Sequence, residues 1–221
     1  MNKKAFIFDL DGVIVDTAKY HFLAWKKLAN SIAVDFNEHQ NEQLKGVSRV
    51  KSLEKILGWA NKSISEDEFM ELMALKNDDY LSYIKKMDDS EILPDVVKVL
   101  DFLIDKNQHI ALGSASKNAR MILEKVNILD KFEVIIDGND VTRAKPNPEV
   151  FMNAAKLLKC KPKNCIVFED SLAGIKAAKI ASMVSIGIGD KKILKKADYV
   201  FNDFTEMSEE FLNELIKEKR T

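Results

Sequence analysis

One short segment near the N-terminus places the strongest constraint on the fold of this chain. The sequence AFIFDLDGVIVDT, residues 5–17, begins with an unbroken apolar run and then presents three carboxylates, Asp9, Asp11 and Asp16. An apolar run without alternation is typical of a parallel strand that is covered on both faces. Acidic side chains directly after such a strand lie at the carboxyl end of a sheet, where open α/β sheets bind their ligands.

The second half of the chain alternates apolar strands with amphipathic helices. The spacing beyond Pro94 predicts strands at 109–114, 132–137, 164–170, 184–189 and 199–201, and helices at 95–106, 118–126, 148–158, 172–181 and 208–218. This alternation predicts a parallel sheet with helices on both faces. The expected fold class is therefore α/β, with a Rossmann-like core.

The segment between the first strand and this region is predicted to be helical. Apolar residues recur at helical spacing over 22–32, 50–57 and 69–84, without a convincing strand. We expect the first strand to join the sheet and the helices to form an inserted cap. The expected division is a core of residues 1–16 and 88–221 and a cap of residues 17–87, with hinges near 14–18 and 88–93.

Composition limits the possible partners. The 221 residues, 46% of them hydrophobic, can bury a full core, and 34 basic against 35 acidic side chains leave a net charge of −1. No overall field attracts nucleic acid or an anionic membrane, and no apolar run approaches the roughly 18 to 20 residues that span a bilayer. The N-terminus lacks a signal peptide pattern, and we interpret Cys160 and Cys165 as reduced thiols. We expect a soluble, cytoplasmic monomer with a small-molecule ligand.

Polar residues gather where the predicted strands end. They are Asp9 and Asp11 after the first strand, Ser114, Ser116, Lys117 and Asn118 after the second, Lys145 beyond the third, and Glu169 and Asp170 after the fourth. Each alone could be a turn former or a helix cap, as Ser116, Asp170 or Ser171 could be. Together they favour a site for phosphate or metal chemistry.

The carboxylates of this set favour a bound cation. Asp9 and Asp11 are two residues apart on an extended chain, so their side chains can point the same way. Like charges this close raise each other's pKa unless a cation or a shared proton intervenes. With Glu169 and Asp170 added, the pocket offers the oxygen ligands that Mg²⁺ prefers. A magnesium site among such residues indicates a phosphate ligand.

Four motifs resemble those of the haloacid dehalogenase superfamily of phosphotransferases in order and spacing. They are DLDGV (9–13), SASKN (114–118), AKPNP (144–148) and EDSLAGI (169–175), and the resemblance covers the chain end to end. The cap stretches YHFLAW (20–25), NEQLKGVSR (41–49) and LKNDDY (75–80) are similar to the sugar-phosphate mutases of that superfamily. The resemblance implies a Rossmann-like core with a helical-bundle cap and Mg²⁺. It also implies interconversion of β-glucose 1-phosphate and glucose 6-phosphate through bound β-glucose 1,6-bisphosphate.

The resemblance assigns roles in the core. Asp9 is the implied nucleophile, which forms an aspartyl phosphate, and Asp11 is the implied general acid and base. Mg²⁺ is expected on Asp9, the backbone carbonyl of Asp11 and Asp170, with Glu169 in or next to its shell. Lys145 and Ser114 are the expected contacts to the transferring phosphoryl group.

The resemblance also assigns roles in and near the cap. It places the second phosphate of a bisphosphate on Arg49, with Ser116, Lys117 and Asn118. Thr17 is an expected hinge position, and His21 is expected to link the position of Asp11 to cap closure, although a lone histidine on a helix is also typical of packing or of the surface. The residues expected to face the sugar are Trp25, Lys45, Gly46, Val47, Ser52 and Lys76, of which Trp25 and Val47 could instead be core residues.

Two departures and two alternatives stay open. Gly113 stands where a larger residue would be usual, and the contacts of the loop GNDVTRAK after Asp137 are uncertain. A phosphatase that releases inorganic phosphate from a sugar phosphate or another small phosphomonoester would share all four core motifs. The cap stretch LKGVSR with Arg49 favours the mutase. A catalytically silent binding protein would be expected to lack Asp9 or Asp11, and both are present.

Overall fold

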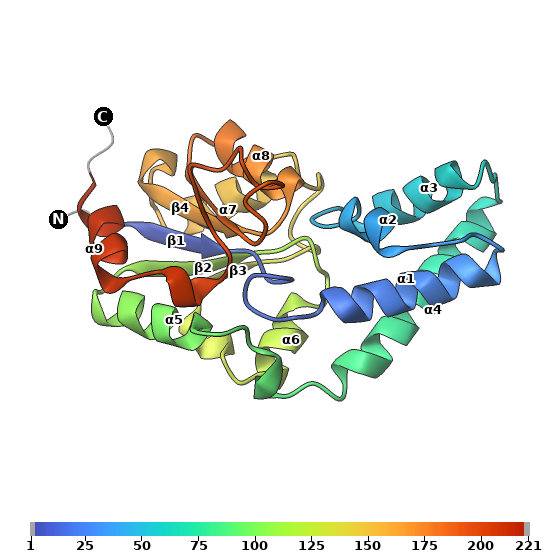
Figure 1. Ribbon diagram of the computed structural model, residues 1–221, viewed down its shortest axis with the longest axis horizontal. Coiled ribbons are helices and arrows are strands. Elements are labelled where there is room, and N and C mark those ends of the chain that lie inside the picture. The colour runs from blue at the N-terminus through green and yellow to red at the C-terminus, as the bar shows by residue number, and fades with distance from the viewer. Residues whose placement is uncertain (1–2, 219–221) are drawn as a thin grey trace.

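The computed structural model describes residues 3–218. At the centre is a six-stranded parallel sheet with the order β3-β2-β1-β4-β5-β6, and helices cover both of its faces (Figure 1). The strands are β1 (Ala5–Phe8), β2 (His109–Gly113), β3 (Val134–Ile136), β4 (Cys165–Glu169), β5 (Val184–Ile188) and β6 (Tyr199–Phe201). The first strand lies between β2 and β4 in the middle of this sheet. The predicted α/β fold class is confirmed.

Alternate residues of β1 pack on opposite sides of the sheet. Phe6 and Phe8 join a hydrophobic cluster with α5 (Val96–Asp105), α6 (Ala119–Lys125) and α9 (Glu209–Lys217). Ala5 and Ile7 join a second cluster with α7 (Glu149–Leu157) and α8 (Leu172–Ile180). All four side chains are fully buried. A strand that is covered on both faces needs apolar residues at every position, which explains the unbroken run in the sequence.

The segment between β1 and α5 folds into the helices α1 (Ala18–Ser31), α2 (Glu38–Glu42), α3 (Arg49–Trp59) and α4 (Glu66–Ile84). Figure 1 shows this group, here called the cap, at the right of the view and beside the sheet rather than on one of its faces. The cap has its own hydrophobic cluster, which includes Trp25, Leu28, Phe36, Leu53 and Ile56. Its helices therefore bury apolar faces against one another, as their spacing predicts. The division at residues 17 and 87 stays a prediction.

Two elements differ from the sequence-based expectation. The short helix α2 was not predicted, because none of its residues is buried and no apolar spacing marks it; a capping box between Asn37 and Gln40 begins it. The strand predicted at 132–137 is shorter, because a 3-10 turn at Leu129–Lys131 precedes it and Phe132 packs into the hydrophobic cluster below the sheet.

The chain passes between the sheet and the cap twice, and the two crossing segments are paired with each other. The backbone N–H of Asp16 donates to the carbonyl of Glu91 (3.0 Å), and that of Leu93 donates to the carbonyl of Ile14 (3.0 Å). The second segment contains the 3-10 helix η1 (Asp89–Glu91). The expected hinges thus form one hydrogen-bonded ribbon rather than two independent linkers.

Two simpler expectations can be compared directly with the structure. Cys160 and Cys165 are both free thiols, the first partly exposed and the second buried. None of the helices within residues 3–218 combines the length and the apolar character needed to cross a membrane.

Candidate active site

A cavity of about 740 Å³ lies where the carboxyl ends of β1, β2 and β4 meet the cap. Nearly every residue that the sequence singles out lines it: Asp9, Asp11, Ser114, Ser116, Lys117, Asn118, Lys145 and Asp170 from the core, and His21, Trp25, Lys45, Gly46, Val47, Arg49, Ser52 and Lys76 from the cap. Thr17 and Glu169 are fully buried behind the lining residues, where Thr17 contacts Asp11 and Glu169 contacts Lys145. Motifs far apart in the sequence therefore converge on one space of the size typical of small-molecule sites.

Lys145 joins two carboxylates at the floor of the cavity. Its Nζ donates to Asp9 Oδ1 (2.5 Å) and to Glu169 Oε1 (2.6 Å), and none of the three side chains is more than 7% exposed. Burial lowers the pKa of Lys145, but the two carboxylates outweigh burial and raise it above its ordinary value. Burial raises the pKa of Asp9 well above its ordinary value; Lys145 opposes this shift, and Glu169, Asp11 and Asp170 add to it. The floor therefore gathers more negative charge than Lys145 balances.

Three carboxylates of the floor could hold a metal ion. Asp9, Glu169 and Asp170 each offer one oxygen, and these oxygens lie within 4.8 Å of one another. Burial raises the pKa of Asp170 to about 7, and the charge of Glu169 contributes to the shift. A hard divalent cation would stabilise such a group, and a donor set made only of oxygens suits Mg²⁺. The residues present therefore fit the predicted cation.

Ser171 fixes the position of Glu169. Glu169 Oε2 accepts hydrogen bonds from the backbone N–H (2.8 Å) and the hydroxyl (2.7 Å) of Ser171. The same hydroxyl accepts the backbone N–H of Gly174 (3.0 Å) and so caps α8, as the sequence suggested for Ser171. A Cβ at Gly174 would lie 1.8 Å from Glu169 Oε1. Both oxygens of Glu169 therefore accept hydrogen bonds, Oε1 from Lys145 and Oε2 from Ser171, and Gly174 leaves the space that this carboxylate occupies.

Asp11 is held by the first turn of α1. The hydroxyl of Thr17 donates to Asp11 Oδ1, and His21 Nε2 lies 3.5 Å from the same oxygen. The other imidazole nitrogen of His21 is 2.9 Å from Lys76 Nζ on α4. Burial raises the pKa of Asp11, but the interactions with His21 and Thr17 outweigh burial and hold it below the ordinary value. This chain of contacts ties a core carboxylate to two cap helices.

Lys76 is buried among aromatic rings of the cap. Its Nζ lies 4.9 Å from the ring centre of Trp25 and 4.5 Å from that of Tyr80. Burial and the charge of Arg49 lower its pKa to about 7. Trp25 belongs to the cap cluster and also lines the cavity, and its contact with a sugar stays a prediction. Val47 is partly exposed and lines the cavity.

The loop after β2 connects the floor to the cap. The hydroxyl of Ser114 accepts the backbone N–H of Ser116 (3.0 Å), and the hydroxyl of Ser116 accepts that of Asn118 (3.2 Å). The side-chain amide of Asn118 donates to Asn77 Oδ1 on α4 (3.2 Å). Lys117 is exposed at the rim. The SASKN motif is therefore a tight turn whose last residue touches the cap.

Two further contacts bring the cap against the floor. Lys45 Nζ lies 3.6 Å from Asp170 Oδ2. Gly46 has φ +68°, and a Cβ there would lie 2.4 Å from Ser171 Oγ. Glycine adopts this backbone conformation without strain and allows the close approach. Together with the contact between Asn77 and Asn118, these interactions close the cap over the cavity.

Sequence reasoning missed three residues at this site. Ser171 was considered only as a helix cap. Tyr80 was placed on the apolar face of its helix and within the stretch LKNDDY without a role of its own. It lines the cavity, is 1% exposed and stacks on His21 with ring centres 4.2 Å apart. Within residues 3–218 its hydroxyl makes no hydrogen bond. Tyr80 could have been found from its position four residues after Lys76, because residues at this spacing share a helix face. The position of Asn77 offers no such signal.

The departure at Gly113 has a packing explanation. A Cβ at this position would lie 2.9 Å from the ring of Phe151 and 3.2 Å from Ile7. Lys145 Nζ lies 4.8 Å from the centre of the same Phe151 ring. The absence of a side chain at Gly113 therefore lets an aromatic ring pack beside the central lysine of the floor.

Comparisons with known proteins agree with this geometry. The model of the haloacid dehalogenase-like hydrolase family matches residues 3–182. A β-phosphoglucomutase from Bacillus subtilis is 43% identical over 213 residues, which cover 96% of this chain and 94% of that protein. A crystal structure of β-phosphoglucomutase from Clostridium difficile, 43% identical, aligns with a TM-score of 0.93 over 97% of each chain. A phosphorylated carbohydrates phosphatase from Thermotoga maritima is 29% identical over 89% of this chain and 92% of its own length.

Proposed function

We propose, since this chain belongs to the haloacid dehalogenase-like hydrolase family, that it catalyses the β-phosphoglucomutase reaction, the interconversion of β-D-glucose 1-phosphate and D-glucose 6-phosphate. This activity makes it an isomerase that moves a phosphoryl group between two positions of one sugar. The observation that carries the proposal is the cavity between core and cap, with Asp9 beside Lys145 at its floor and Arg49 in its roof, which is the side that the cap lines. The cavity thus offers separate cations to a sugar with two phosphates.

Asp9 is the proposed nucleophile. One of its oxygens attacks phosphorus, a new bond forms between that oxygen and phosphorus, and the bond from phosphorus to the sugar oxygen breaks. Lys145 holds Asp9 in place and, with Ser114, offers positive charge and a hydroxyl to the equatorial phosphoryl oxygens. The product is an aspartyl phosphate, which divides one transfer between two sugar positions into two steps.

Asp11 is the proposed general acid and base. It accepts the proton of the sugar C6 hydroxyl as that oxygen attacks the aspartyl phosphate, which yields β-glucose 1,6-bisphosphate. After the bisphosphate reorients, Asp11 returns the proton to the C1 oxygen as Asp9 takes the C1 phosphoryl group. The contacts of Asp11 with Thr17 and His21 keep its carboxylate at a fixed position for both transfers.

The carboxylates Asp9 and Asp170, with the backbone carbonyl of Asp11, are the proposed magnesium ligands, and Glu169 lies in or beside that shell. When bound, Mg²⁺ supplies positive charge to the oxygens of the transferring phosphoryl group. The raised pKa values of Asp9 and Asp170 support this assignment, because a cation at this position would relieve the repulsion among the carboxylates.

The roof is the proposed site of the phosphate that is not transferred. Arg49 can bind a phosphate bidentately, and Ser116, Lys117 and Asn118 line the same cavity from the core side. Trp25, Lys45, Gly46, Val47, Ser52 and Lys76 are the proposed contacts to the sugar ring. A closed roof also excludes water, which would otherwise hydrolyse the aspartyl phosphate.

One assay distinguishes the mutase from the phosphatase alternative. The protein is given β-glucose 1-phosphate, Mg²⁺ and a trace of the 1,6-bisphosphate, and glucose 6-phosphate and inorganic phosphate are followed together. We expect glucose 6-phosphate to form with little phosphate release. Phosphate that appears in step with substrate loss would instead make the enzyme a phosphatase, as the similarity to the Thermotoga maritima protein would then suggest.

We further propose that the protein works as a monomer in the cytoplasm. Two free thiols and a closed site contained within one chain support this proposal. Light scattering on the protein as it elutes from a size-exclusion column measures the oligomeric state. A mass twice that of the 25.1 kDa chain would contradict the proposed monomer.

A further inference from the structure

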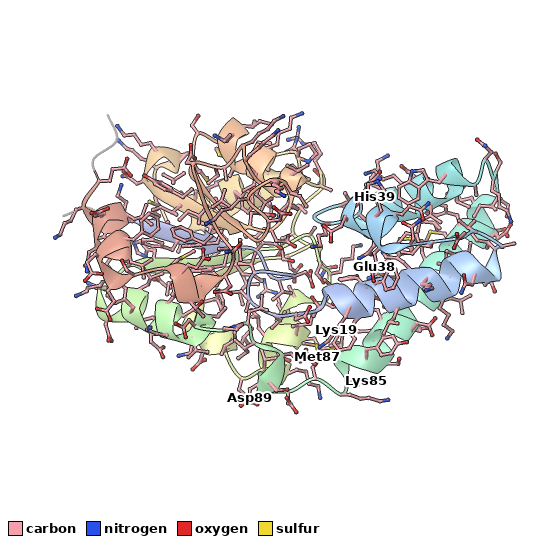
Figure 2. The ribbon with its side chains drawn as sticks, viewed as in Figure 1. Lys19, Glu38, His39, Lys85, Met87 and Asp89 are labelled. Carbon is pink, nitrogen blue, oxygen red and sulfur yellow. The ribbon has the colours of Figure 1, made fainter. Side chains whose placement is uncertain are left out.

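Glu91, in the second crossing segment, holds the first turn of the cap through both of its carboxylate oxygens. The hydroxyl of Tyr20 donates to Glu91 Oε1 (2.5 Å), and Lys19 Nζ donates to Oε2 (2.7 Å). The Glu91 side chain is 15% exposed and its bond with Tyr20 is partly buried, whereas the Lys19 side chain is 47% exposed. Figure 2 labels Lys19 at the start of α1, with Met87 and Asp89 in the segment that returns from the cap.

The backbone and a second ring reinforce this arrangement. The backbone carbonyl of Glu91 accepts the N–H of Asp16. Glu91 is therefore bonded both to side chains of α1 and to the backbone of the segment that leads into α1. The ring of Tyr20 stacks on that of Tyr83 near the end of α4, with centres 5.5 Å apart and planes within 7°. The first and last helices of the cap therefore meet the hinge ribbon at one place.

The same turn of α1 carries the residues that hold Asp11. Thr17 donates to Asp11, and His21, one helical turn further on, lies 3.5 Å from it. Tyr20 lies between them in the sequence and reaches Glu91 instead. The turn is thus fixed on one side to the hinge and on the other to the proposed general acid and base.

We propose that Glu91 is a positioning residue for phosphoryl transfer to the sugar, and that it acts through Tyr20, Lys19 and the first turn of α1 on the position of Asp11 and on the closure of the cap. This inference rests on the proposed mutase function and extends it to a residue outside the cavity. Asp9 and Lys145 lie on the core side of the ribbon, so the phosphorylation of Asp9 does not depend on Glu91. Transfer to a sugar hydroxyl, and protection of the aspartyl phosphate from water, do depend on it.

The test separates the two half-reactions. Acetyl phosphate with Mg²⁺ phosphorylates Asp9, and the phosphorylated protein is then mixed with β-glucose 1-phosphate while glucose 6-phosphate and inorganic phosphate are measured. For Glu91→Ala we expect phosphorylation by acetyl phosphate within about twofold of the original rate. Transfer to the sugar should fall about tenfold, because small misplacements of reacting groups are costly, and phosphate released per glucose 6-phosphate should rise several-fold. Tyr20→Phe removes one of the two bonds and should change the same ratio by about threefold.

A matched control lies in the same turn. Asp89 is exposed, and Asp89→Asn removes a nearby charge without touching α1, so its product ratio should equal that of the original protein. Equal losses in both half-reactions for Glu91→Ala and Tyr20→Phe, or an unchanged product ratio in both, would overturn the proposal. If the original protein itself releases phosphate in step with substrate loss, the mutase function fails instead, and the two failures are therefore distinguishable.

Discussion

The floor and the roof of the cavity differ in charge and in construction. The floor consists of side chains at strand ends, mostly carboxylates around Lys145, and its central groups are at most 7% exposed. The roof consists of side chains of the cap, and the charged groups that it contributes, Lys45, Arg49, Lys51 and Lys76, are basic. Phosphoryl transfer needs one carboxylate as the nucleophile and another as the general acid and base. The phosphate that is not transferred needs cations to bind it. The comparison therefore assigns the chemical step to the floor and the choice of acceptor to the roof.

The largest effect is expected for the nucleophile of the floor. Asp9→Asn removes the attacking oxygen, so both the phosphorylation by acetyl phosphate and the mutase reaction should fall by a factor on the order of 10⁴ or more. Radiolabelled phosphate on the protein and glucose 6-phosphate formation measure the two steps. Substantial mutase activity in this variant would show that another group receives the phosphoryl, and the assignment of the chemistry to Asp9 would then be wrong.

A roof residue should affect only one of the two steps. Arg49→Ala is expected to reduce transfer to the sugar by about 10- to 100-fold, the effect of losing hydrogen bonds to a charged group, with acetyl phosphate phosphorylation largely retained. Arg49→Lys keeps the charge but not the bidentate geometry, so its loss should be smaller. Equal loss of both steps in Arg49→Ala would argue against a distal-phosphate role and would remove the division between floor and roof.

The contact between roof and floor can be changed at a single glycine. Gly46→Ala places a Cβ 2.4 Å from Ser171 Oγ at a residue with φ +68°, so the cap should sit further from the floor. We expect a loss of mutase rate of about fivefold and more phosphate release per turnover. Gly58→Ala on α3 is the matched control, since nothing lies within 4 Å of its added Cβ, and its kinetics should be unchanged. An unchanged product ratio in Gly46→Ala would show that closure at this contact does not control access of water.

The smallest effect concerns the stability of the roof. The pKa of Lys76 is about 7 in the folded protein and about 10.4 in an unfolded chain, so between these values the unfolded chain binds more protons. The contribution of Lys76 to the free energy of unfolding therefore rises by about 1.4 kcal/mol between pH 6 and 8 and is lost as the pH falls through 7. Asp170, with a pKa raised to about 7, contributes with the opposite sign over the same range, so the Lys76 part is obtained as a difference between two proteins. Urea unfolding of Lys76→Met and of the original protein at both values measures the difference. If the two proteins have the same pH dependence, Lys76 is not the titrating group.

Much of the floor could be predicted from the sequence, because its residues follow regular elements. The apolar run of β1 and the alternation after Pro94 indicate where the strands end, and parallel strands bring their carboxyl ends together. Asp9, Ser114 and Asp170 could thus be grouped before their distances were known. The catalytic roles of these residues stay predictions that the variants above test.

The roof could be predicted only in part. Arg49 and Lys76 were identified from the resemblance of the cap stretches, and no spacing in those helices indicates which residues point toward the core. Tyr80 was hidden because an aromatic residue on an apolar helix face is typical of a core position. Asn77 and Glu91 were missed because single polar residues on helices are common and the partners of these two are distant in the chain.

The sequence by itself determined the sheet, its covered faces and the carboxylates at its edge, because the apolar pattern of each segment indicates its secondary structure and which of its faces are buried. The resemblance of the AKPNP motif placed Lys145 near these carboxylates, but only the tertiary structure decided its contacts: Lys145 is 136 residues from Asp9, and it lies between Asp9 and Glu169. The same holds for the cap, whose contact with the floor through Lys45 and Gly46 and whose attachment at Glu91 join segments far apart in the chain. Such contacts depend on how the packed elements are arranged in space, and no local pattern encodes that arrangement.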